Sequence, residues 1–317
     1  MRQVASSFDT LTMSDVGGRR TSAYWTIMKS AALIIGFVVA LATTGYVADQ
    51  QLPSEPQRAF GASVTGAFEG WYDNPDGSRT ILVGYLNRNA NQALDVPIGM
   101  NNRIEPGGPD LGQPTHFLPG RRHGMFAIVV PRDFTPEQRL TWTIVANGQS
   151  TTIPLRLHPD YVVSPFTDVA VKNVPPIVRF EENGPAIQGP IAMLTSALSR
   201  TARISAPLSL TVFVSDDARY ASGTMALPLK PPPPVRLLWS KYRGPGSVTF
   251  DDTEPSMTTL AGGAVNVPFS GKATTNARFS EPGDYVLHVT AMDYSGEGGG
   301  GEVCCWTTAI VKVSVTR

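Results

Sequence analysis

Apolar and polar residues alternate in short runs along most of the chain after residue 60. In "DYVLHVTAM" (284–292), Tyr285, Leu287 and Val289 would share one face of a strand, while Val286 and His288 would share the other. The Asn147-Gly148 pair between two such runs is typical of a hairpin, because both turn positions need a positive φ. The pattern predicts an all-β chain.

The same pattern divides the folded region into two parts of the usual sandwich size. Residues 61–165 would form the first β-sandwich, and residues 173–317 the second. The first part contains a long connection rich in Gly, Pro and Asn at residues 95–124, which is expected to be either functional or mobile. We therefore predict two tandem β-sandwich domains.

The N-terminal region differs from this pattern. A polar extension (1–27) precedes an apolar segment (28–48), and a proline-bearing linker (49–60) follows it. A cleaved signal peptide and an uncleaved anchor helix over residues 31–48 both fit, and Met28 as the true start is a further alternative. In each case the folded part would be secreted, periplasmic or at the cell surface, or held at the inner membrane with an extracytoplasmic C-terminus.

The second part carries an ordered series of short motifs. They are "NVPP" (173–176), a strand ending in two acidic residues (207–217), "WSKYRGPGSVTF" (239–250) and "TTNARFSEPGDYVL" (274–287). In this order they resemble the PKD-type immunoglobulin-like repeats of bacterial surface proteins. The resemblance implies an immunoglobulin-like sandwich for residues 173–317, with longer loops than the compact repeat at 218–234 and 296–301.

Charge and motifs narrow the function classes. Lys and Arg number 26, equal to the 26 Asp and Glu, and no basic block is present, so we predict no nucleic-acid partner. The chain has no G-x-S-x-G, no H-E-x-x-H and no phosphate-binding glycine loop. We therefore predict that the protein is not an enzyme.

Two groups of residues could hold a metal ion. His116, His123 and Met125 offer imidazole and thioether ligands of the kind that copper accepts. Two acidic pairs offer carboxylates to calcium: Asp216 with Asp217, and Asp251 with Asp252 and the nearby Glu254. The second, in "DDTEP" (251–255), lacks the spaced pattern of a dedicated calcium loop. Surface or structural roles are the alternative for both groups, so no cofactor is predicted and calcium stays open.

Cys304 and Cys305 are the only two cysteines, and they are adjacent. Across a trans peptide their Cα atoms would stand ~3.8 Å apart, less than a disulfide normally spans. An exported chain nevertheless meets an oxidising compartment. We expect a vicinal disulfide, with two reduced thiols or a bond from Cys304 to another chain as alternatives.

Together these features predict a non-catalytic bacterial protein, exported or membrane-anchored, that binds a surface carbohydrate or protein. Recognition would use loops at the sandwich ends and exposed aromatic residues such as Trp71 or Tyr72. One alternative is an accessory extracytoplasmic subunit of a membrane protein complex. The other is a copper-dependent enzyme that uses His116, His123 and Met125.

Overall fold

The computed structural model describes residues 55–317, apart from 169–171, 191–193, 195–196, 220–232, 265 and 295–303. The extension 1–27, the segment 28–48 and the start of the linker lie outside the described residues, as do most of the loops 218–234 and 296–301. Residues 55–317 belong to one compact unit, and the regular elements bounded within its described residues are strands and a 3-10 turn at Pro159–Tyr161. The predicted all-β class is confirmed. Within the described ranges, no helix has the length and apolarity needed to cross a membrane.

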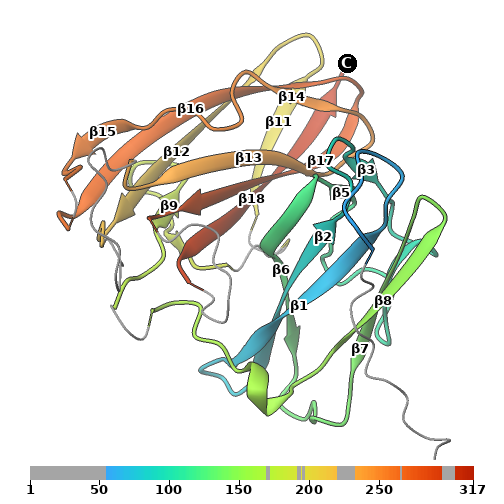
Figure 1. The fold of residues 1–317 in the computed structure, drawn as a ribbon. Helices are drawn as coiled ribbons and strands as arrows, with labels where there is room; N and C mark the ends of the chain where they lie inside the picture. Colours follow the sequence, from blue (N-terminus) through green and yellow to red (C-terminus); the bar gives the residue numbers. More distant parts are fainter. Residues whose placement is uncertain are drawn as a thin grey trace, which may run out of the picture. The chain divides into compact units, whose positions relative to one another are not determined.

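The first half (residues 55–165) is built from two three-stranded antiparallel sheets and one short strand pair (Figure 1). One sheet has the order β1-β2-β6 and the other β4-β7-β8, while β3 pairs with β5. The connection at 95–124, predicted to be either functional or mobile, contains β4, β5 and the start of β6. The strands are β1 (Val64–Asp73), β2 (Arg79–Asn87), β3 (Leu94–Asp95), β4 (Asn102–Glu105), β5 (His116–Phe117), β6 (Gly120–Val130), β7 (Leu140–Ala146) and β8 (Gln149–Leu155).

Turn residues and aromatic packing explain how the two sheets of the first half form and pack together. Asn147 (φ 49°) and Gly148 (φ 73°) connect β7 to β8, so the predicted hairpin is confirmed. Between the two sheets, Trp142 packs edge-on against Phe126 at 5.2 Å. These rings belong to a buried apolar cluster, called the first core below, that contains residues of both sheets.

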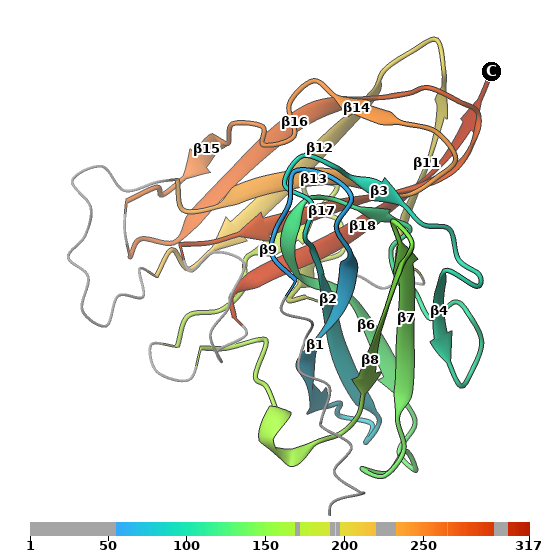
Figure 2. The ribbon, with the colours of Figure 1, turned by 45° about the vertical axis from the view of Figure 1, so that its right-hand side comes forward.

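The second half (residues 173–317) consists of two sheets facing each other (Figure 1, Figure 2). One has the order β10-β9-β12-β16-β14, with β15 also on β16, and the other has the order β11-β18-β17-β13. All pairs are antiparallel except β11 with β18. The strands are β9 (Ile177–Arg179), β10 (Ile187–Gln188), β11 (Leu198–Arg203), β12 (Leu208–Asp216), β13 (Arg236–Arg243), β14 (Val248–Phe250), β15 (Thr258–Ala261), β16 (Phe269–Phe279), β17 (Gly283–Met292) and β18 (Trp306–Thr316).

The core of the second half lies between these sheets. Tyr285, Leu287 and Val289 point into it from alternate positions of β17, as their period of two predicted, and Trp239 of β13 is fully buried there. Tyr285 also closes a corner, because its hydroxyl donates to the carbonyl of Glu281 at 2.9 Å and accepts from the N–H of Gly246 at 3.0 Å.

The opposite face of β17 is also buried, which the alternation did not predict. His288 stacks on Tyr242 of β13, with 5.7 Å between the ring centroids, and the Tyr242 ring belongs to the first core. The N–H of Thr115 donates to the carbonyl of Tyr242 at 3.1 Å. The two halves therefore meet through the loop before β6, and β13 contributes to both cores.

Candidate binding site

A groove of about 950 Å³ lies at one end of the first half. The end of β1, the turn from β1 to β2, the end of β6 and the segment 162–166 enclose it. Its walls are mostly apolar, with a polar rim on the side of the turn. The lining residues used below are Tyr72, Asp73, Asn74, Val129, Val162 and Phe166.

Large apolar side chains are exposed in this groove. Val162 is 56% exposed, Val129 45% and Phe166 39%, and Tyr161 beside them is 50% exposed. Tyr72 meets Phe166 edge to face, with ring centroids 5.4 Å apart. Exposed apolar groups gathered in one place mark interaction sites, whereas single exposed ones are common on any surface.

The polar rim is largely satisfied by its own contacts. The amide of Asn74 donates to the hydroxyls of Ser78 and Thr80, both at 2.9 Å. Asp73 pairs with Arg79 at 3.3 Å. Burial raises the pKa of Tyr72, and a hydrogen bond with Thr80 offsets part of that effect. Burial therefore favours the neutral form of Tyr72, and the polar side chains of the rim are occupied by contacts with one another.

Trp71 and Gly70 hold the groove wall in place. The Trp71 indole N–H donates to the carbonyl of His158 at 2.8 Å, and its carbonyl accepts from the N–H of Val163 at 2.9 Å. Gly70 has φ 116°, and a Cβ there would stand 2.6 Å from the carbonyl oxygen of Tyr161. Of the two aromatic residues proposed from sequence, Tyr72 lines the groove and half-buried Trp71 positions its wall.

A second cleft, of about 610 Å³, lies where the halves meet, and it contains His116. The His116 Nδ1 lies 3.0 Å from an oxygen of Asp95, and the buried Lys241 ammonium donates to the same oxygen at 2.9 Å. Burial alone would raise the pKa of Asp95, but the hydrogen bonds from His116 and Lys241 outweigh it and lower the pKa. This cluster joins the halves, and neither Asp95 nor Lys241 stood out in the sequence.

The three copper candidates have separate surroundings. His116 contacts Asp95, whereas the Nδ1 of His123 lies 3.4 Å from buried Glu69 and its ring faces Trp306. Met125 is buried in the first core. Across the ranges that the structure describes, no three side chains of His, Cys, Asp or Glu gather closely enough to hold a metal ion.

Asp216 and Asp217, the first pair of calcium candidates, differ from each other in their surroundings. Asp217 pairs with Arg219 at 3.5 Å, while Asp216 is buried and accepts from the N–H of Ala218 at 2.7 Å. Burial raises the pKa of Asp216 to about 7, and the nearby charge of Asp293 adds to this. Asp293 in turn accepts from the amide of Asn173 at 2.7 Å. Sequence reasoning missed both partners, although "NVPP" drew attention to Asn173.

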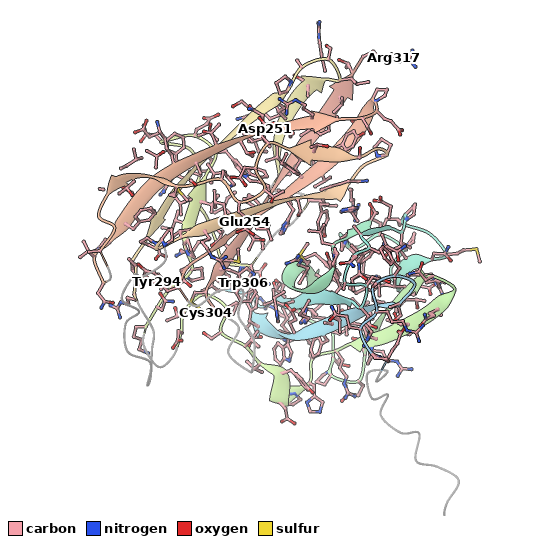
Figure 3. All side chains as sticks on the ribbon, turned by 45° about the horizontal axis from the view of Figure 1, so that its top comes forward. Asp251, Glu254, Tyr294, Cys304, Trp306 and Arg317 are labelled. Atoms are coloured by element: carbon pink, nitrogen blue, oxygen red, sulfur yellow. A yellow bond between two sulfur atoms is a disulfide. The ribbon has the colours of Figure 1, made fainter. Side chains whose placement is uncertain are left out.

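Cys304 and Cys305 are joined in a disulfide, and the peptide bond between them is cis. Both residues are buried, and their sulfur atoms lie 3.9 and 3.5 Å from the carbonyl oxygen of Asn173. The last strand begins one residue later, at Trp306, so the pair precedes the strand that it was expected to open. Figure 3 shows Cys304 near Trp306, at the start of this strand.

Comparison with known proteins gives little further guidance. No family model matches the chain, and no curated protein matches it. A solved structure described as "Anomalous substructure of Titin-A168169" matches over 80% of this chain and 99% of that one, with 12% identity and a TM-score of 0.22. A likeness at that TM-score does not assign a fold type. The residues of the chain itself therefore carry the functional argument.

Proposed function

We propose that this chain is a non-catalytic extracytoplasmic binding protein whose groove holds an apolar segment of a protein partner. One observation carries the proposal. Of the eight large apolar side chains exposed among the described residues, Val129, Val162 and Phe166 line the groove and Tyr161 adjoins it. The other four are Phe60, Met100, Leu260 and Val267.

The chemistry of the walls favours protein over carbohydrate. Two of the exposed groups are valines, and Tyr72 and Phe166 meet at 89° instead of presenting one flat platform to a sugar ring. Asn74, which could bind sugar hydroxyls, already donates to Ser78 and Thr80. Apolar burial would then supply most of the affinity, at roughly 25 cal/mol per Å². A carbohydrate ligand is the alternative.

We further infer that residues 173–317 are an immunoglobulin-like domain of the PKD type. The sheet orders β9-β12-β16-β14 and β18-β17-β13 correspond to the usual ABED and GFC sheets. Trp239 is buried on β13, which corresponds to strand C, and the Tyr285 hydroxyl on β17 binds the backbone of Glu281 as in a tyrosine corner. Both features are further hallmarks of that fold. The ordered motifs support the PKD type. Such domains suit a role in surface binding.

The proposed location is outside the cytoplasm. The signal or anchor segment 28–48 supports export, and a disulfide between Cys304 and Cys305 suits an oxidising compartment. If residues 31–48 stay as an anchor, the same groove would make the chain an accessory subunit of a membrane complex. N-terminal sequencing of the mature protein separates these cases, since an intact start upstream of residue 31 supports the subunit.

Site-specific crosslinking in the producing cells tests the groove. A photoreactive residue in place of Val162 is expected to capture one protein species. The same residue in place of Val267, an exposed valine outside the groove, is the matched control and should capture none. Equal capture at both positions, or capture of glycan alone at position 162, would refute a protein partner.

A further inference from the structure

Three buried polar side chains lie at the end of the second half where the chain enters it, because Ser215, next to Asp216, pairs with Ile177 at the start of β9 and the Asn173 amide binds Asp293. Asn173 precedes β9, Asp216 ends β12 and Asp293 follows β17, so three separate segments contribute. They are 0%, 8% and 5% exposed, respectively. The Asn173 carbonyl accepts from the N–H of Asp168 at 2.8 Å, which fixes the connector from the first half. Figure 3 labels Tyr294, the residue that follows Asp293 in the chain.

Two oxygen atoms in this cluster are buried without a hydrogen-bond partner. They are Oδ1 of Asn173 and Oδ1 of Asp216. The Asn173 amide is oriented by its Nδ2, which donates to Asp293 at 2.7 Å, because the reverse orientation would place two oxygens together. Buried polar groups almost always have a hydrogen-bond partner, because desolvating one without a partner destabilises the fold. The pair of orphan oxygens therefore points to a missing donor or cation.

The charges at the cluster point the same way. Besides burial, the negative charge of Asp293 and, to a smaller extent, that of Asp217 repel the ionised form of Asp216 and contribute to its raised pKa. Among the described residues, Asp216 forms no ion pair with Lys or Arg, since Arg219 is directed at Asp217. A positive ion between the carboxylates would relieve the repulsion and satisfy both orphan oxygens.

We propose that Asn173, Asp216 and Asp293 bind a calcium ion that fixes the connector to the second half. Calcium takes six to eight oxygens from carboxylates, amide carbonyls, backbone and water, and it tolerates irregular geometry. Two carboxylates and one amide supply part of this shell, and their number suits the weak affinity of extracellular modules, a Kd of about 10⁻⁴–10⁻³ M. The site is separate from the groove, and it shares only Asp216 with the Asp216–Asp217 pair considered from sequence.

Thermal unfolding of the full chain with and without calcium tests the proposal. At a calcium concentration of about 100 times Kd, the Tm of the natural protein should rise by roughly 5 °C over its value in chelator. Asp216→Asn should lose this rise. In chelator it should be at least as stable as the natural protein, because the change removes the repulsion with Asp293. Asp284→Asn, an exposed carboxylate on β17, is the matched control and should keep the full rise.

Terbium luminescence gives a second measurement that does not depend on stability. Saturable emission sensitised by nearby aromatic rings, displaced by calcium, is expected from the natural protein and not from Asn173→Ala or Asp216→Asn. A shared proton is the competing occupant. It predicts a Tm that varies with pH and not with calcium. That result, or an equal calcium effect in Asp216→Asn, overturns the proposal.

Discussion

At the scale of single residues, the lack of a side chain at Gly70 allows segment 161–163, which forms the groove wall, to pack against β1. A Cβ at this position would stand 2.5 Å from a methyl of Val163 and 2.6 Å from the Tyr161 carbonyl, and φ is 116°. We expect Gly70→Ala to reduce the free energy of unfolding by about 2–4 kcal/mol, from overpacking and strain combined. Denaturant unfolding measures this.

Gly107→Ala is the control for that change. Gly107 has nearly the same φ, 113°, but no atom within 4 Å of the added Cβ. It therefore reports the backbone strain alone, about 1 kcal/mol. If both variants lose equal stability, the close approach between β1 and segment 161–163 is not a constraint on residue 70.

His288 predicts a pH dependence of stability. Burial lowers its pKa to about 4, and the charge of Arg122 contributes further. The unfolded chain, with a His pKa near 6.5, binds more protons between pH 4 and 6.5. Stability from this group is therefore present above pH 6.5 and is lost as pH falls toward 4, by about 3 kcal/mol in all.

The comparison of the natural protein with His288→Phe isolates this effect, since Phe keeps an aromatic ring against Tyr242. Asp216 acts in the opposite direction over the same range, because its pKa is raised to about 7. The free energy of unfolding of the natural protein minus that of His288→Phe should fall by about 3 kcal/mol as pH falls from 6.5 to 4. A difference that stays constant with pH would contradict a buried neutral His288.

The sequence predicted which residues of a strand are buried better than it predicted contacts between distant residues. The inward face of β17 was predicted correctly, because alternation within one strand reports which face is buried. Asp95 and Lys241 look like surface residues in the sequence, and their contact joins positions 146 residues apart. No local pattern encodes such a pair, so it could not be predicted.

At the scale of elements, β13 joins the two halves. Trp239 faces the core of the second half, whereas Tyr242 is buried in the first core. Arg243 on the same strand binds Asp110 through two nitrogens, at 2.9 and 2.8 Å. Part of the connection at 95–124 packs against this strand. Its Gly and Pro content indicated only that it would be functional or mobile.

Truncation of Tyr242 should uncouple the halves. We expect Tyr242→Ala to cost about 3–5 kcal/mol, because it leaves a cavity in the first core. Calorimetry of the natural protein should show one unfolding transition, and that of the variant two, the first half melting first. Tyr242→Phe, which loses only the hydroxyl bond to Gly112, should cost about 1 kcal/mol and keep one transition. Two transitions in the natural protein would contradict a shared junction.

At the scale of the whole molecule, turn chemistry and alternation predicted an all-β chain, and the structure confirms it. The groove could be predicted only in part. Tyr72 stood out as an aromatic residue, but Val162 and Phe166 lie in a segment without periodicity. Their exposure depends on how Trp71 and Gly70 hold that segment against β1. Such tertiary contacts have no signal in a single sequence.

The central claim is that the groove binds a protein segment through apolar contact. The most direct test is the affinity of the full chain for the partner captured at position 162, compared with that of Phe166→Ser. Because Phe166 would be an aromatic anchor buried in the complex, its loss should weaken binding at least about tenfold. Leu260→Ser, at an exposed apolar position outside the groove, should bind like the natural protein. Unchanged affinity in Phe166→Ser, with the fold intact, would contradict the claim.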